Sequence, residues 1–175
     1  GHHATGLTDI KLTVRAGEIV GIAGISGNGQ SRLLGVCMGE LKQTKGSVKL
    51  FGEVVDDLDP AERRAKGLRY VPEQRLGHGS VPEFSLINNT LLTGDDFHSH
   101  GFIKQEEAET FTDLVIERFH VKPEAPKAAA RSFSGGNLQK FIVGREILSS
   151  PGVLIIDQPK WGVKVGAVTV IHNYL

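Results

Sequence analysis

Sulfur-containing residues are scarce in this chain. Its 175 residues include one cysteine and one methionine. The lone cysteine, Cys37, excludes an internal disulfide framework and is typical of a reducing compartment. Basic and acidic residues number 20 each, so no bulk field attracts nucleic acid or an anionic membrane. We therefore expect no nucleic-acid partner.

Long apolar runs are also missing. No run approaches the roughly 20 residues that a membrane-spanning helix needs. The polar start of the chain carries no signal-peptide pattern. With 39% hydrophobic and 23% charged residues, the composition is that of one globular domain with a core.

Short apolar stretches alternate with helical patterns along the chain. The apolar patterns predict strands over 10–14, 18–24, 46–52, 68–72 and 153–157. Helical spacing predicts helices over 60–66, 105–119 and 136–148, and a further helix after the glycine-rich turn near residue 30. Another helix is predicted to start within 167–175, and residues 73–82 are predicted to form a loop. Strands that alternate with helices predict an α/β fold with a mostly parallel sheet and flanking helices.

A glycine-rich loop joins the second predicted strand to a helix. Gly24–Ser31, G-I-S-G-N-G-Q-S, fits the phosphate-loop frame G-x-x-x-x-G-K-[ST] except that Gln30 stands at the lysine position. Backbone N–H groups in such a loop form an anion nest with the helix N-terminus, and Ser31 could hold Mg²⁺. The predicted ATP-binding residues are Gly24, Ser26, Gly27, Asn28, Gly29, Gln30 and Ser31.

The neutral Gln30 weakens this prediction without removing it. A lysine would neutralise phosphate charge, whereas an amide offers only a neutral hydrogen bond. Charge-assisted bonds are roughly twice as strong as neutral ones, so we expect weaker phosphate binding and still weaker catalysis. The alternative is a plain turn between strand and helix, which the strand and helix on either side disfavour.

Two further motifs follow in order. The run Ser132–Lys140, S-F-S-G-G-N-L-Q-K, places a serine and two adjacent glycines before a helix. This helix N-terminus is a second candidate anion site, although such residues more often only cap a helix. The apolar strand 153–157 ends in Asp157, which is predicted to hold Mg²⁺ through water, or alternatively to cap the next turn. Gln158 then stands where a catalytic base is needed, and glutamine cannot accept the proton.

Taken in order, these motifs resemble the ATP-binding domain of ABC transporters, from Gly6 to the end of the chain. Gly24–Ser31 resembles its Walker A motif, Ser132–Gln139 its signature and Val153–Asp157 its Walker B motif. The runs V-P-E-x-R, S-G-G-N-x-Q-K and Q-P-x-W-G-V are similar to the second of two fused ATPase domains in sugar and nucleoside importers. Within these, the G-N-G-Q form is most similar to the branch that works with basic-membrane-lipoprotein-type binding proteins.

The resemblance implies a head-to-tail pair of such domains, with ATP and Mg²⁺ between the Walker motifs of one and the signature of the other. It also implies transmembrane permease subunits, an indirect solute-binding lipoprotein partner, and a cytoplasmic, peripheral place on the inner face of the membrane. The Walker positions Gln30 and Gln158 are degenerate here. The intact signature residues, expected to act in trans, are Ser134, Gly135, Gly136 and Gln139.

Some positions depart from the family pattern. The position of the family's Q-loop glutamine corresponds to Glu73 or Gln74, and the run V-P-E favours Glu73. Lys164 takes the place of the D-loop aspartate. The switch histidine would lie beyond Leu175, so we expect a single incomplete domain over 1–175, truncated at its C-terminus. It would comprise a P-loop NTPase-like core (roughly 6–85 and 149–175) with added antiparallel strands, and a helical subdomain (roughly 86–148).

These observations predict the ATP-binding domain of an ABC importer for simple sugars or nucleosides. It would dock on a permease through the loop around residues 73–85 and hydrolyse ATP poorly by itself. Two alternatives stay open: a self-sufficient P-loop ATPase, or a scaffold whose phosphate loop no longer binds nucleotide.

Overall fold

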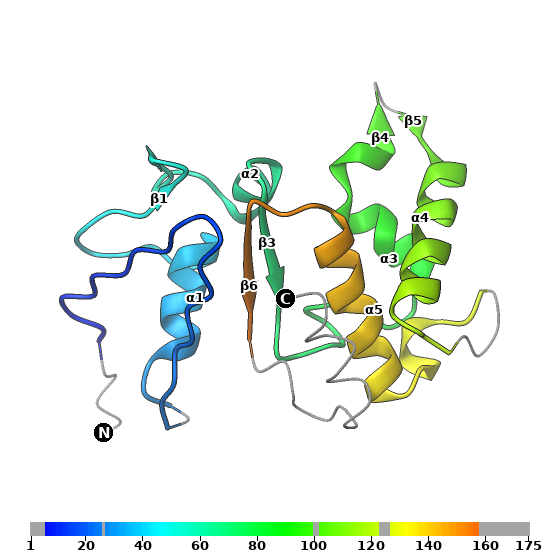
Figure 1. Cartoon of the computed structure of the whole chain (residues 1–175), viewed down its shortest axis with the longest axis horizontal. Coiled ribbons are helices and arrows are strands. Elements are labelled where there is room, and N and C mark those ends of the chain that lie inside the picture. Colours follow the sequence, from blue (N-terminus) through cyan, green and yellow to red (C-terminus); the bar gives the residue numbers. More distant parts are fainter. Residues whose placement is uncertain (1–5, 26, 100–101, 123–126, 158–175) are drawn as a thin grey trace. The chain divides into compact units, whose positions relative to one another are not determined.

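The computed structural model describes residues 6–25, 27–99, 102–122 and 127–157. The chain divides into two units, one up to Lys66 and one from Gly67 onward, each with its own helices and strands (Figure 1). No helix among the described residues is long and apolar enough to cross a membrane.

Among its described residues, the first unit contains two helices and one hairpin. They are α1 (Gln30–Met38), β1 (Lys49–Leu50), β2 (Glu53–Val54) and α2 (Pro60–Ala65), with β1 and β2 antiparallel. At α2, the Asp59 carboxylate accepts from the Glu62 N–H and the Glu62 carboxylate accepts from the Asp59 N–H, both at 2.8 Å. This reciprocal cap, with Pro60 at the first helical position, explains why the predicted helix over 60–66 is confirmed.

Two strand predictions in the first unit are wrong, and a third is confirmed only in part. The predicted strand 46–52 is reduced to β1 (Lys49–Leu50), because Phe51 (φ 53°) and Gly52 (φ 84°) form the tight two-residue turn that leads into β2. The chain forms no strand over 10–14 or 18–24, and Ile19 is 80% exposed. A strand exists only where a neighbour takes its N–H and C=O groups, and apolar alternation does not supply that neighbour.

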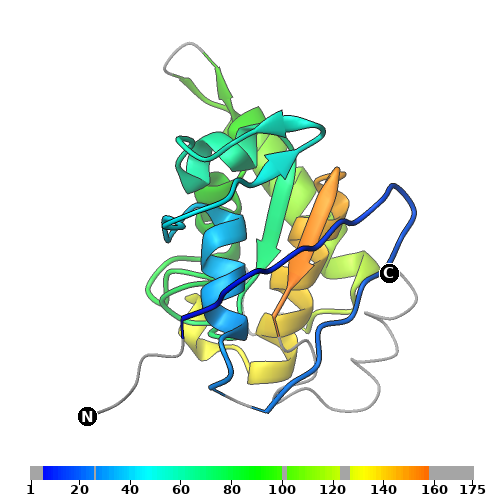
Figure 2. The same cartoon turned by 90° about the vertical axis from the view of Figure 1, so that its left-hand side faces the viewer.

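The second unit is built around a parallel strand pair. β3 (Leu68–Val71) pairs with β6 (Val153–Ile156), Leu68 opposite Val153 and Val71 opposite Ile156. Figure 2 shows the two strands side by side. The remaining elements are α3 (Leu86–Thr93), η1 (Asp95–Phe97), the hairpin β4 (His98–Ser99) and β5 (Phe102–Ile103), α4 (Gln105–Arg118), η2 (Ala130–Ser132) and α5 (Gly135–Leu148).

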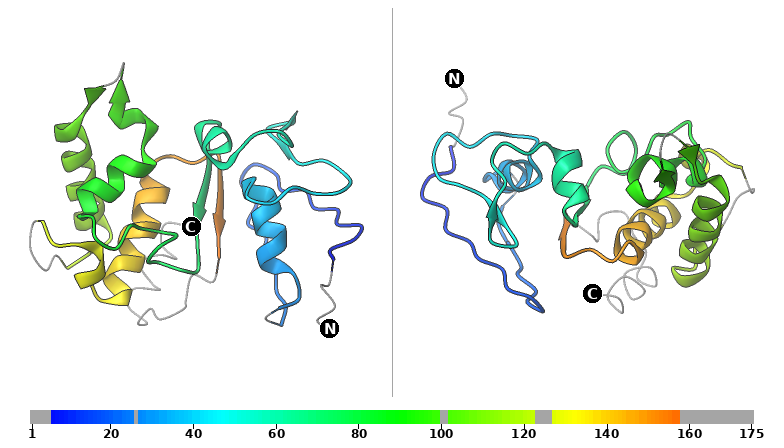
Figure 3. Two further views of the ribbon diagram at one scale, coloured as in Figure 1. Left: turned by 180° about the vertical axis from the view of Figure 1, so that it is seen from behind. Right: turned by 90° about the horizontal axis from the view of Figure 1, so that it is seen from above.

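Helix α5 lies between the strand pair and helices α3 and α4 (Figures 1 and 3). Its central residues Phe141, Ile142 and Val143 are fully buried. They pack with Val71 of β3 and with Phe119 just after α4. This apolar core fixes α5, and with it the residues at its start, relative to the carboxyl end of β3.

Most predicted elements of the second unit are confirmed. The helices over 105–119 and 136–148, the strands over 68–72 and 153–157 and the loop over 73–82 agree with the structure to within a residue or so at each end. The helix predicted over 167–175 lies outside the described residues. The division into a core and a helical subdomain stays a prediction, because 158–175 belongs to that core.

Candidate functional site

The glycine loop leads into α1, as the sequence predicts. Gly27 (φ 91°) and Gly29 (φ 102°) take left-handed backbone conformations that favour glycine. The Asn28 N–H donates to the Ile25 carbonyl at 3.2 Å, which closes a turn. Helix α1 has no side-chain cap and no acidic residue in its first turn. Its N-terminus is thus suited to an anion, which needs backbone N–H donors and no competing carboxylate.

The Gln30 side chain folds back onto this loop. Its Nε2 donates to the Ile25 carbonyl at 3.2 Å. A Cβ added at Gly24 would lie 2.3 Å from the same Nε2, so the amide lies directly against the glycine backbone. The amide therefore stabilises the shape of the loop and adds no positive charge to it.

The signature residues lie at the start of α5. Ser134 is the N-cap residue, and its Oγ accepts from the Asn137 N–H at 3.4 Å. Ser134 is exposed, and Gly135 and Gly136 after it are half-buried in the first turn. Gln139 lies one turn further along and is only 2% exposed. The four predicted signature residues thus divide into an accessible first turn and a buried glutamine.

Arg75 is a residue of this region that sequence reasoning missed. Its guanidinium lies against the first turn of α5, since a Cβ added at Gly135 would be 3.1 Å from Arg75 Nη2 and 3.3 Å from its Cζ. Arg75 is the last residue of the run V-P-E-x-R, in which the sequence predicts a role for the glutamate alone. The structure therefore brings a cation to the signature glycines.

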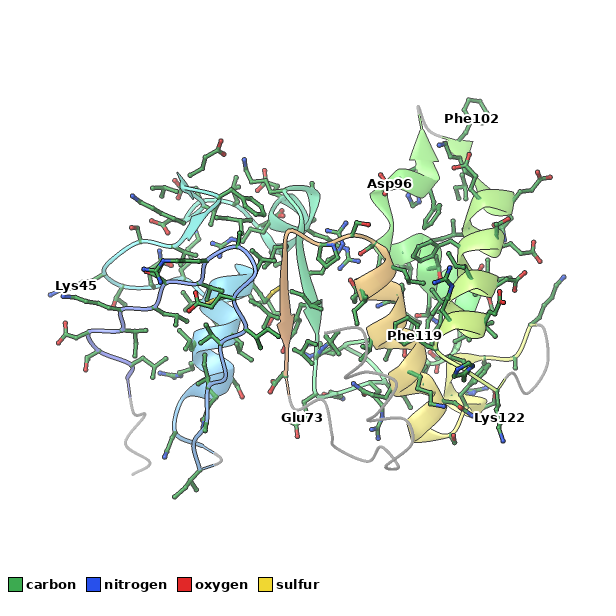
Figure 4. All side chains as sticks on the ribbon, in the orientation of Figure 1. Lys45, Glu73, Asp96, Phe102, Phe119 and Lys122 are labelled. Carbon is green, nitrogen blue, oxygen red and sulfur yellow. The ribbon has the colours of Figure 1, made fainter. Side chains whose placement is uncertain are left out.

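Two predicted carboxylates share one edge of the parallel pair. Asp157 directly follows β6, and its N–H donates to the Val71 carbonyl at 2.9 Å, at the end of β3. Glu73 lies two residues beyond Val71 and is half-buried, and Figure 4 labels its side chain. The carboxyl ends of parallel strands are where open α/β sheets place ligands. Both residues thus follow the carboxyl ends of the paired strands, and their roles in binding stay predictions.

Ser31 and Asp157 carry oxygen atoms of the type that binds Mg²⁺ together with ATP. Magnesium takes oxygen ligands, often one or two carboxylates, and keeps several waters. The exposed Ser31 hydroxyl of the first unit and the Asp157 carboxylate of the second are both of that type. Within the described part of the chain, no three or more His, Cys, Asp or Glu side chains gather as a metal cluster. Ser26 and Gln158, also predicted for the site, lie outside the described residues, as does Lys164.

Similarity to known proteins agrees with these motifs. Residues 7–160 match the family described as ABC transporter. The chain is 37% identical over 170 residues to the guanosine import ATP-binding protein NupO of Bacillus subtilis and 37% identical over 169 residues to the nucleoside import ATP-binding protein NupA of Lactococcus lactis. It is 33% identical over 168 residues to the ribose import ATP-binding protein RbsA of Oceanobacillus iheyensis. Each match covers 95% of this chain but only 33 or 34% of the relative.

Solved structures agree on the fold. The dimeric ATP-binding cassette MJ0796 bound to ADP and Pi superposes with a TM-score of 0.78 at 23% identity, covering 93% of this chain and 70% of that one. The cassette MJ1267 gives a TM-score of 0.73 at 23% identity, covering 93% of this chain and 66% of that one. The predicted fold class, a mixed α/β cassette with a parallel sheet and helices, is confirmed. With nearly all of its length matched, the chain belongs to the ABC transporter family.

Proposed function

We propose that this chain is the ATP-binding part of an importer for simple sugars or nucleosides, and that its signature acts in trans on ATP held by a partner ATPase domain. The observation that carries the trans role is the start of α5. There the exposed Ser134 precedes two helical glycines, and no acidic residue occupies the first turn. The names of the three relatives, which import guanosine, nucleosides or ribose, support the solute class.

The chain's own nucleotide site is the loop Gly24–Ser31. We assign ATP to it because α1 presents an N-terminus without a side-chain cap, and Mg²⁺ to Ser31 and Asp157 because both offer oxygen donors. The bound Mg²⁺ would supply charge neutralisation at the phosphates. With Gln30 and Gln158 at the lysine and glutamate positions, the chain provides neither the usual cation nor a general base. Hydrolysis at this site is therefore expected to be slow.

The remaining parts of the proposal concern the assembly. The partners are a second ABC ATPase domain and a transmembrane permease, with a solute-binding lipoprotein acting indirectly. The loop 73–85 would dock on the permease, with Glu73 at the Q-loop position. The exposure of Phe84 in that loop, 41%, supports a contact there. This arrangement places the chain in the cytoplasm, on the inner face of the membrane.

The decisive experiment is Ser134→Ala in the assembled transporter. We expect ATP hydrolysis to fall on the order of 100-fold, as when one preorganised hydrogen-bond donor is removed from a reacting centre. The matched control is Thr110→Ala, which removes an exposed hydroxyl of α4 that donates to the Glu106 carbonyl at 2.9 Å. Hydrolysis that survives Ser134→Ala would overturn the trans role.

Two measurements on the purified chain separate the alternatives. Titration with a fluorescent ATP analogue and Mg²⁺ should give saturable binding, and none up to millimolar concentration would favour a scaffold. Steady-state hydrolysis should be very slow. Robust turnover that is insensitive to replacement of Gln158 would favour a self-sufficient ATPase.

A further inference from the structure

Arg145, near the C-terminal end of α5, joins three segments of the second unit. Its side chain is only 4% exposed. Nη2 donates to the Gly79 carbonyl at 3.0 Å, and Nη1 donates to the Asn89 carbonyl at 3.1 Å. Nε donates to Oε1 of the fully buried Glu146 at 2.9 Å. One guanidinium thus ties α5 to the loop after β3 and to α3.

The loop after β3, residues 72–85, lies directly on α5. A Cβ added at Gly79 would be 2.9 Å from Ile142 Cδ1 and 3.1 Å from the Arg75 carbonyl oxygen, so no larger residue fits without movement. The Gly79 N–H donates to the Gln74 carbonyl at 3.0 Å. The Ser80 hydroxyl donates to the Arg75 carbonyl at 2.8 Å. These bonds close the loop on itself and fix the backbone that carries Arg75.

The other end of the loop is held against the segment that leads into the signature. The Ala130 N–H donates to the Phe84 carbonyl at 2.8 Å, and the Arg131 N–H donates to the Pro82 carbonyl at 3.0 Å. With the Arg75 guanidinium against Gly135, the loop therefore contacts the signature region from both of its ends.

Asn89 extends this connection into α3. Its side chain, 1% exposed, accepts from the Val81 N–H at 2.7 Å and donates to the Val81 and Phe84 carbonyls, each at 3.1 Å. Arg145 binds the Asn89 backbone carbonyl and also holds Gly79, two residues before Val81. The same arginine thus secures the middle of the loop directly and its C-terminal end through Asn89.

We propose that Arg145 is a positioning residue for the signature, which sets where the loop 72–85, and with it Arg75, lies against Ser134–Gly136. The inference rests on the proposed trans role of that signature. Lysine cannot replace the guanidinium, because a single ammonium group lacks the planar fork that reaches two carbonyls and a carboxylate together. The bonds from Arg145 to the Gly79 and Asn89 carbonyls reach the loop and α3, so we expect its effect on the signature to pass through the loop.

The first test measures amide hydrogen exchange in the chain with Arg145→Lys. Because each lost charge-assisted bond is costly, we expect amides of 74–82 and 134–138 to exchange about tenfold faster or more. The matched control is Thr112→Val, which removes a buried hydroxyl of α4 whose hydrogen bond, at 2.8 Å, is to Thr90 of α3. The proposal would be overturned if the faster exchange were confined to the loop amides 74–82, or if Arg145→Lys and Thr112→Val accelerated exchange equally.

The second test measures ATP hydrolysis by the assembled transporter. Arg145→Lys should lower kcat about tenfold and leave KM for ATP unchanged, because it alters the geometry of the signature and no nucleotide-binding group. Thr112→Val should retain kcat. If Arg145→Lys fails to fold, Gly79→Ala disturbs the same contact from the loop side and must give the same pattern.

Ser134→Ala separates the two proposals. If it abolishes hydrolysis while Arg145→Lys matches the Thr112→Val control, the positioning inference is wrong and the trans signature stands. If Ser134→Ala leaves hydrolysis intact, the proposed trans role of the signature is wrong. Any change in hydrogen exchange caused by Arg145→Lys would then have no consequence for catalysis.

Discussion

At the scale of single residues, the charge of residue 30 determines how strongly the glycine loop can hold phosphate. Gln30 uses its amide on the Ile25 carbonyl and brings no cation. We expect Gln30→Lys to bind MgATP about tenfold more tightly, since a charge-assisted bond to phosphate exceeds a neutral one by roughly 1–1.5 kcal/mol. Equilibrium titration with a fluorescent ATP analogue measures the change.

The control for Gln30→Lys is Gln105→Lys, which adds the same charge at the exposed start of α4 in the other unit. It should leave the affinity unchanged. Equal tightening by both variants would mean that only net charge matters, and no tightening by Gln30→Lys would mean that the loop does not receive phosphate.

The chemistry of Cys37 provides a pH-dependent prediction. Burial raises the pKa of its thiol, and the Arg63 guanidinium lowers it by a smaller amount. The folded chain therefore keeps the proton above the unfolded pKa of about 8.5, and it loses stability as the pH rises from there through the folded pKa. At pH 8 we expect iodoacetamide to alkylate folded Cys37 several times more slowly than the urea-unfolded chain. Equal rates would contradict a thiol that the fold half-buries.

At the scale of elements, Arg63 of α2 binds the C-terminal end of α1. Its side chain is 1% exposed. Nη1 donates to the Val36 and Cys37 carbonyls at 2.7 and 2.9 Å, and Nη2 to the Val55 carbonyl at 2.7 Å. Carbonyls in the last turn of a helix lack the usual i+4 donor, so Arg63 supplies a charged donor to two of them, and the Val36 carbonyl also accepts from the Gly39 N–H at 3.2 Å. The guanidinium thus joins α1, α2 and the chain after β2.

Arg63→Met should lower the free energy of unfolding by roughly 2–4 kcal/mol, because the buried carbonyls lose a charged donor while the apolar stem is kept. Urea denaturation of the chain measures this loss. Arg32→Met, on the exposed side of α1, serves as the control and should change stability by less than about 0.5 kcal/mol. If Arg63→Met lowers the free energy of unfolding by no more than Arg32→Met does, water replaces the guanidinium as the donor to these carbonyls.

The elements also indicate what sequence reasoning can recover. β3 and β6 were predictable because short apolar runs bounded by turns describe strands buried in a parallel pair. The start of α5 was predictable because Ser134 is a strong cap residue. Residues 18–24 have the same apolar character as β6 but form no strand, since a pattern does not supply a pairing neighbour. Arg145 was missed because an arginine that binds backbone carbonyls has no periodic signal.

At the scale of the whole molecule, the exposed apolar surface is uneven. Many of the large apolar side chains that are more than a third exposed fall within residues 7–25, and Ile19 and Ile25 are each 80% exposed. The residues of α5 from Leu138 to Glu146 are, by contrast, nearly all buried. A segment with few buried contacts and no strand ladder opens at little cost, whereas a core helix opens only with much of its unit.

Limited trypsin digestion should therefore cut the chain first at Lys11 and Arg15, both exposed in the extended segment, and should spare Arg145. Mass spectrometry of the earliest fragments identifies the bonds cleaved. The urea-unfolded chain, in which every lysine and arginine is accessible, is the control and should be cut at Arg145 as readily as at Arg15. A first cut within α5 would mean that the second unit is the less stable one. The buried arginine network would then not hold its core together.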